Sequence, residues 1–169
     1  MSFHEKIISE EVLRGERALV LMANGGPVVL PNGLPEAVRV HVIGICDKVH
    51  LGSGVALASI VAEGTTIVAA GQFSCGEIRA GGLTASSDVE VVTMSLTGDA
   101  DIAGKLIGLK GAAIEIDGAL RARAVEVEGV IALHGDVSVK DFLVATVLES
   151  DKAILCETKI IGDEAFVIA

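Results

Sequence analysis

The stretch VEVEGVIALHGDVSVKDFLVA, residues Val125–Ala145, alternates apolar and polar residues in bursts of about three to five residues, separated by Gly, Asp or Lys. Alternation of this kind predicts β-strands with one buried and one solvated face. Strands this short gain stability when each pairs in parallel with an equivalent strand on either side. The stretch therefore predicts a chain that winds into stacked coils, where one coil is one turn of a solenoid.

The alternation recurs with a period of about eighteen residues, as expected of a repeat protein. Three interleaved series of i, i+2 pairs share this period, and the two residues of each pair point to one face of a strand. We expect the following pairs to face a common core: Gly71 and Phe73, Val89 and Val91, Ile107 and Leu109, Val125 and Val127, and Leu143 and Ala145 in the first series; Leu83 and Ala85, Ala100 and Ile102, Leu120 and Ala122, and Val137 and Val139 in the second; Met94 and Leu96, Ala112 and Ile114, and Ile131 and Leu133 in the third.

Glycine and aspartate breaks repeat at nearly the same interval, at Gly98-Asp99, Asp117-Gly118 and Gly135-Asp136. Both residue types accept tight corners. The span from about Val38 to Ile161 holds roughly seven coils, which makes a rod roughly 30 Å long at an interstrand spacing of about 4.8 Å. We therefore predict an all-β, single-domain, triangular parallel β-helix. An antiparallel sandwich is the alternative, since hairpins also produce alternation and Gly-Asp turns.

Composition and charge narrow the function classes. The 169 residues are 51% hydrophobic but only 2% aromatic, so Val, Ile, Leu and Ala must fill the core. The formal net charge is −10, and the thirteen Lys and Arg residues are scattered along the chain. Nothing in this pattern marks a surface for polyanions, and we expect no nucleic-acid partner.

The cysteines and the apolar runs bear on cellular location. Cys46, Cys75 and Cys156 are odd in number, widely spaced and form no CxxC motif, which is typical of buried thiols in a reducing compartment. Cys75 lies near Phe73 and is interpreted as a core residue. The longest apolar run, residues 18–23, is far shorter than the roughly twenty residues that a bilayer requires. A cytoplasmic location is expected.

The N-terminal segment, residues 1–37, lies outside the repeat and is interpreted as a cap on a β-helix of residues 38–169. Ser2 and Glu5 have the spacing of a capping box, and the apolar residues that follow predict a short helix ending at Gly15. Arg17–Met22 and Pro27–Leu30 flank Asn24-Gly25-Gly26, a pattern that predicts a hairpin. The alternative role is docking to a second subunit or a membrane surface. The apolar residues of the predicted helix are Ile7, Ile8, Val12 and Leu13.

The segment from about Leu83 to Gly162, with GDADIAGKLIGLKGAAIEIDGALRARAVEVEGVIALHGDVSV at its centre, resembles the bactofilins, a family of small bacterial cytoskeletal proteins. The resemblance rests on short Val/Ile strands, frequent Gly-Asp corners and outward Glu and Lys. It implies a right-handed β-helix that polymerises end to end into filaments without nucleotide, although three strands per coil fit either hand. Similar coil texture occurs in the C-terminal domain of the division inhibitor MinC, which pairs through its β-helix.

The ends of a β-helix suggest self-assembly on physical grounds as well. A terminal coil exposes unpaired strand N–H and C=O groups, and the apolar sequence near the C-terminus has few charged or proline residues to block strand addition. We expect a homo-oligomer or filament formed through terminal coils, with a peripheral membrane or scaffold partner as a further expectation. A capped monomer is the alternative. The predicted self-association residues are Leu155, Ile160, Phe166, Val167 and Ile168.

An enzymatic function is the rival reading. Leu51-Gly52 and Leu57-Ala58 resemble the hexapeptide repeats of left-handed β-helix acyltransferases, which act as trimers with a histidine as general base. His50 or His134 would be that base, but the sequence offers neither a partner. We expect no enzyme activity and no catalytic residues.

No cofactor and no metal site are expected either. His41 and His50 share no metal-site spacing with a third ligand, and His4 lies in the terminal segment. Lys105, Arg123 and Asp141 recur at the coil interval and are predicted to form an outward charge ladder, in which each pair contributes little.

Overall fold

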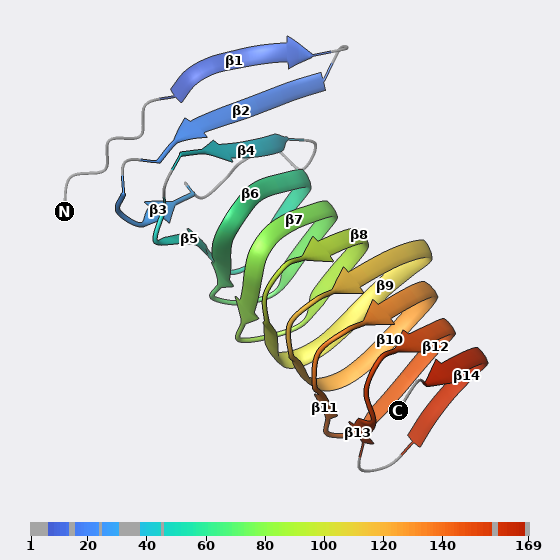
Figure 1. The fold of residues 1–169 in the computed structure, drawn as a ribbon. Helices are drawn as coiled ribbons and strands as arrows, with labels where there is room; N and C mark the ends of the chain where they lie inside the picture. Colours follow the sequence, from blue (N-terminus) through green and yellow to red (C-terminus); the bar gives the residue numbers. More distant parts are fainter. Residues whose placement is uncertain are drawn as a thin grey trace.

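Strands stack side by side along one axis and form a single 14-stranded sheet that winds into a rod (Figure 1). The computed structural model describes residues 7–13, 16–23, 25–30, 38–44, 46–156 and 159–167, and it describes side chains only between residues 19 and 156 of these ranges. These residues form strands and turns and contain no helix. The prediction of an all-β, single-domain parallel solenoid of about seven turns is confirmed.

The strands vary from two to seventeen residues, because the longer ones bend around the rod and cover more than one face. The N-terminal half contains β1 (Ile7–Leu13), β2 (Glu16–Met22), β3 (Val28–Val29), β4 (Arg39–Ile43), β5 (Lys48–Leu51), β6 (Val55–Ala69) and β7 (Phe73–Ala85). The C-terminal half contains β8 (Val89–Leu96), β9 (Ala100–Ile116), β10 (Leu120–Leu133), β11 (Val137–Val139), β12 (Phe142–Ser150), β13 (Ile154–Cys156) and β14 (Lys159–Val167).

Parallel pairing brings equivalent residues of successive coils into columns. In β10 the register shifts twice, which divides the strand into segments 120–122, 124–127 and 129–133. Every second residue of a segment faces the core, so each coil places one layer of aliphatic side chains directly over the layer before it. Full burial of one such side chain contributes about 1.5–3 kcal/mol. The longest inner column runs from β2 to β14 and consists of Leu19, Val40, Ile60, Ile78, Met94, Ile114, Ile131, Leu148 and Ala165.

The second predicted series matches the structure pair for pair. Leu83 pairs with Ala100, Ala100 with Leu120 and Leu120 with Val137, and all four side chains are buried. Successive residues of this series lie 17, 20 and 17 positions apart, so coil length varies along this face too. The series matches because its i, i+2 apolar pairs were followed from coil to coil with slips in the interval.

The other two series were wrong in part. Val125 pairs with Leu106 rather than Ile107, and Val127 pairs with Gly108 rather than Leu109. The three exposed residues 109–111 are an insertion, because the register jumps between Val91 and Thr93 on the neighbouring strand β8. Gly111, at a φ of 78°, provides the positive φ in this bulge.

Two further pairs are displaced for the same reason, unequal coil length. Phe73 and Cys75 occupy the inward positions predicted for Gly71 and Phe73, since Phe73 pairs with Val89 only sixteen positions later. In the third series, Met94 pairs with Ile114 instead of Ala112, twenty positions on.

The predicted N-terminal helix is wrong. Ile7–Leu13 forms strand β1, which pairs antiparallel with β2. The β-branched residues of this segment favour extended backbone, and pairing satisfies the outer edge of β2. The hairpin between Arg17–Met22 and Pro27–Leu30 is also wrong, because β2 pairs in parallel with β4, and β3 with β5. Parallel stacking thus begins inside residues 1–37.

A column of glycines forms one corner of the central coils. A Cβ atom on Gly98 would lie 2.3 Å from the carbonyl oxygen of Gly81, and one on Gly135 would lie 2.2 Å from that of Gly118. Gly118 donates its backbone N–H to the carbonyl oxygen of Gly98 at 3.0 Å. Successive coils therefore approach so closely at this corner that no side chain fits between them.

Candidate functional site

The last described coil has strand edges with no neighbour among the described strands. Among the described strands, β13 pairs only with β11, and β14 pairs only with β12 (Figure 1). Strands in the middle of the rod have parallel neighbours on both sides; β10, for example, lies between β9 and both β11 and β12. The outer edge of the last coil therefore presents backbone groups that a further strand can pair with.

Two of the predicted self-association residues continue inner columns. Ile160 pairs with Leu143, and Val167 pairs with Ser150, and both of these partners are buried. The register thus places Ile160 and Val167 in β14 at positions that continue buried columns of the core.

Two others continue outward columns. Leu155 pairs with Ser138, and Phe166 pairs with Glu149. Leu155 is 71% exposed, the largest exposed fraction among the large hydrophobic residues whose side chains are described. Ile168 lies outside the described residues. The sequence prediction thus combined residues from the core columns with residues from the outer wall.

A ladder of polar residues runs along the corner next to this end. The same corner holds one polar residue on each of three successive coils. These residues directly follow the last residues of β9, β10 and β12 and are Asp117, His134 and Asp151. Each donates its backbone N–H to the coil before it, to the carbonyl oxygens of Leu96, Ile116 and Leu133 at 2.9, 3.0 and 3.0 Å. Regular stacking therefore fixes the backbone from which these side chains project.

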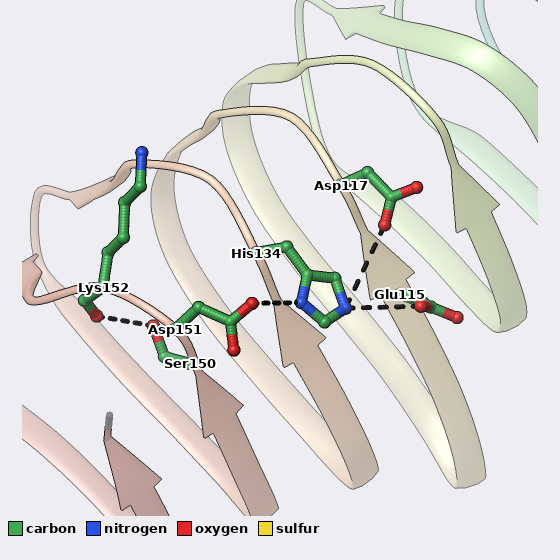
Figure 2. A network of polar contacts seen from close by, with 6 residues as sticks. All are labelled: Glu115, Asp117, His134, Ser150, Asp151 and Lys152. Carbon is green, nitrogen blue, oxygen red and sulfur yellow. Dashed lines mark hydrogen bonds and ion pairs between the residues drawn. The ribbon is translucent and has the colours of Figure 1, made fainter. Parts of the chain in front are cut away.

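His134 is the centre of the polar network in Figure 2. Its Nδ1 lies 2.6 Å from Oδ2 of Asp151, and its Nε2 lies 3.3 Å from Oε1 of Glu115 and 4.0 Å from Oδ1 of Asp117. The hydrogen bond to Asp151 raises the pKa of His134 above its ordinary value, and the other two carboxylates act in the same direction. The network can hold a proton or another cation between three coils.

His134 and His50, the two candidate general bases, do not converge. His50 lies in β5, in an outward column that continues through Val68, Thr84, Asp101 and Arg121 on the coils that follow. Sequence reasoning assigned no partner to His134, yet Asp117 and Asp151 lie seventeen residues before and after it. Applying the coil period to corner residues would have identified the contact.

The predicted charge ladder is confirmed in part. Nε of Arg123 lies 3.1 Å from Oδ2 of Asp141, and both side chains are largely solvated, so screening keeps the pair weak. Lys105 does not join it, because its Nζ lies over the ring of Phe142 at 5.6 Å from the centroid. Arg121, Arg123 and Lys140 line an open groove together with Leu155 and Cys156.

The three cysteines are free thiols, and Cys75 is buried in the core as predicted. Burial raises the pKa of Cys75 to about 12. Its thiolate is therefore scarce at neutral pH, which argues against a nucleophilic role.

Comparison with known proteins yields no relative for this chain. No protein-family model matches it, and neither does any curated protein or solved structure. Within the described residues, no helix is long and apolar enough to cross a membrane.

Proposed function

We propose that this chain is a structural, self-assembling protein, a bactofilin-like cytoskeletal scaffold that polymerises through the ends of its β-helix without nucleotide. The observation that carries the proposal is the open C-terminal coil, in which β13 and β14 each have one unpaired edge among the described strands. A second copy docked there would extend the backbone ladder in the way that each internal coil does.

The apolar side chains at this end favour the same conclusion. Ile154 continues the column of Leu120 and Val137, yet it is only partly buried while those two are fully buried. Leu155 beside it is mostly exposed. Covering them with another copy would remove apolar surface from water, at about 25 cal/mol per Å².

The two ends of the rod differ, and this determines the geometry of assembly. Among the described strands, the outermost one at the N-terminal end is β1, which runs antiparallel to β2, whereas the outermost ones at the C-terminal end are parallel to their neighbours. Contact between unlike ends produces a filament, and contact between two C-terminal ends produces a closed dimer. The proposal is the filament, formed in the cytoplasm with a membrane or scaffold partner that anchors it.

Electron microscopy and sedimentation of the purified chain test the proposal. Filaments should form at moderate salt without nucleotide, and salt should promote assembly because the formal net charge of −10 repels other copies. Discrete dimers at all concentrations would favour a MinC-like binding module, and compact trimers an acyltransferase-like protein. Either result, or a persistent monomer, would contradict polymerisation.

A matched pair of substitutions locates the contact. Leu155→Glu places a charge at the terminal coil, whereas Leu109→Glu places one on an exposed bulge of β9 far from the ends. Leu155→Glu should abolish filaments while the β-sheet circular dichroism stays unchanged, and Leu109→Glu should assemble like the parent protein. Equal assembly of the two variants would exclude the C-terminal coil as the contact.

A further inference from the structure

We propose that Glu115, Asp117 and His134 form a binding site for a divalent transition-metal ion of the Zn²⁺ class, with Asp151 orienting the imidazole. The three side chains offer one nitrogen and two carboxylate oxygens, and these ligand atoms all lie within 4.8 Å of one another. No second such group of three occurs among the residues that the structure describes. The site lies on an outer corner of the rod, next to the C-terminal coil, and uses none of the open strand edges.

The distances suit a small ion. Two ligand atoms at the usual Zn–N and Zn–O distances of about 2.1 Å lie about 3.4 Å apart in a tetrahedral site. The separation of 3.3 Å between Nε2 of His134 and Oε1 of Glu115 already matches. The separation of 4.0 Å between Nε2 and Oδ1 of Asp117 must shorten by about 0.6 Å, which a half-exposed carboxylate can achieve by side-chain rotation.

The imidazole is oriented by a group outside the ligand set. Nδ1 of His134 lies 2.6 Å from Oδ2 of Asp151, so the Nδ1–H donates to that carboxylate, and Nε2 faces Glu115 and Asp117, where its lone pair becomes available once its proton leaves (Figure 2). A carboxylate on the second nitrogen of a ligating histidine fixes its tautomer and strengthens it as a ligand. The site thus contains both the ligands and their support.

The ligand chemistry selects the class of metal. An imidazole nitrogen suits Zn²⁺, Ni²⁺ and Cu²⁺, whereas Mg²⁺ and Ca²⁺ prefer sites made entirely of oxygen. Two carboxylates and a neutral imidazole carry two negative charges, which balance a divalent ion. Three protein ligands leave at least one coordination position for water or for a group from a partner.

Each coil contributes a different part of the site. Glu115 lies in β9 and Asp117 in the turn that follows, His134 follows β10, and Asp151 follows β12. A bound ion would therefore cross-link two coils directly and a third through Asp151. Because the ion must displace a proton from Nε2, protons and metal compete for the same position.

Zinc titration of the full chain tests this inference. The chain, with Cys46 and Cys156 replaced by Ser to remove the partly exposed thiols, is stripped with EDTA and titrated with Zn²⁺ against a chromophoric chelator at pH 7.5. We expect one Zn²⁺ per chain. His134→Asn should lower the affinity by about 100-fold, and Asp151→Asn by about 10- to 100-fold although Asp151 is not a ligand.

His50→Asn is the matched control, since His50 is also an outward histidine of the rod, and it should leave zinc affinity unchanged. Histidine ¹⁵N spectra should show Zn²⁺, but not Mg²⁺, perturbing Nε2 of His134. Circular dichroism of the metal-free variants checks that they remain folded. Failure of the parent chain to bind Zn²⁺, or equal affinity of folded His134→Asn and parent, would overturn the site. The titration is run on the Leu155→Glu background as well, so its outcome does not depend on assembly.

Discussion

The middle of the rod and its C-terminal coil have the same architecture but different surroundings. Leu120 in β10 and Ile154 in β13 belong to one inner column, yet Leu120 is fully buried and Ile154 only partly. The difference arises because β10 has neighbours on both sides, whereas β13 pairs with β11 alone among the described strands. A pattern that buries side chains in the middle of the solenoid thus leaves them partly exposed in a coil that has one described neighbour.

The largest expected effect on stability comes from shortening the side chains of Leu120 and Ile154, which belong to this inner column. Leu120→Ala should lower the free energy of unfolding by about 2–5 kcal/mol, because it leaves a cavity between two coils. Ile154→Ala should cost clearly less in the monomer, since its side chain is partly solvated already. Urea unfolding followed by circular dichroism measures both. If the two substitutions lower the free energy of unfolding by the same amount, the side chains in the middle and at the C-terminal coil do not differ in their contribution to stability.

A smaller effect is expected at the glycine corner of the middle coils. Gly135→Ala places a Cβ 2.2 Å from the carbonyl oxygen of Gly118, and neither backbone can move without disturbing the ladder. We expect a loss of about 1–3 kcal/mol, typical of overpacking. Gly26→Ala, near the N-terminal end, meets no atom within 4 Å and should be nearly neutral. A comparison of thermal melting curves distinguishes the two, and a stable Gly135→Ala protein would show that the corners are loosely packed.

The smallest effect is a pH dependence at the corner that joins the terminal coil to the middle. The pKa of His134 is raised above its ordinary value of 6.5 by Asp151 and, more weakly, by Glu115 and Asp117. Its contribution to stability is therefore fully present below about pH 6.5 and is lost as the pH rises through the higher folded-state value.

The parent chain and His134→Asn, both in EDTA, should differ in unfolding free energy at pH 5.5 and converge by pH 9. Salt should reduce the difference, because the network is exposed. A difference that does not change with pH would indicate that the imidazolium adds nothing to the attachment of the last coil.

Sequence prediction placed side chains correctly where successive i, i+2 apolar pairs could be followed from coil to coil. Along the face that contains Leu83, Ala100, Leu120 and Val137 the interval varies from 17 to 20 residues, and each side chain was placed correctly because its apolar pair was matched individually. Prediction with a fixed period failed at Ile107, because the bulge at residues 109–111 lengthens one coil and shifts the apparent register by one residue. A one-residue shift in a strand exchanges its buried and exposed faces, so small errors in period have large consequences.

The N-terminal segment and the corner site were missed for other reasons. The spacing of Ile7, Ile8, Val12 and Leu13 fits a helical stripe as well as a strand, and the β-branched side chains of the first three together with pairing to β2 select the strand. The partners of His134 are far from it in sequence, so local motifs could not identify them. Repeat proteins build sites from residues one coil apart, and such sites appear only when the period is applied to polar positions.

The corner glycines have a consequence for how the length of the particle is encoded. Since no side chain separates the coils at Gly81, Gly98, Gly118 and Gly135, the pitch there is set by the backbone alone. Each extra coil in the gene would lengthen the subunit by the same increment, about 4.8 Å. Duplication or loss of whole coils can therefore change the length of the subunit in equal steps without altering the terminal coils.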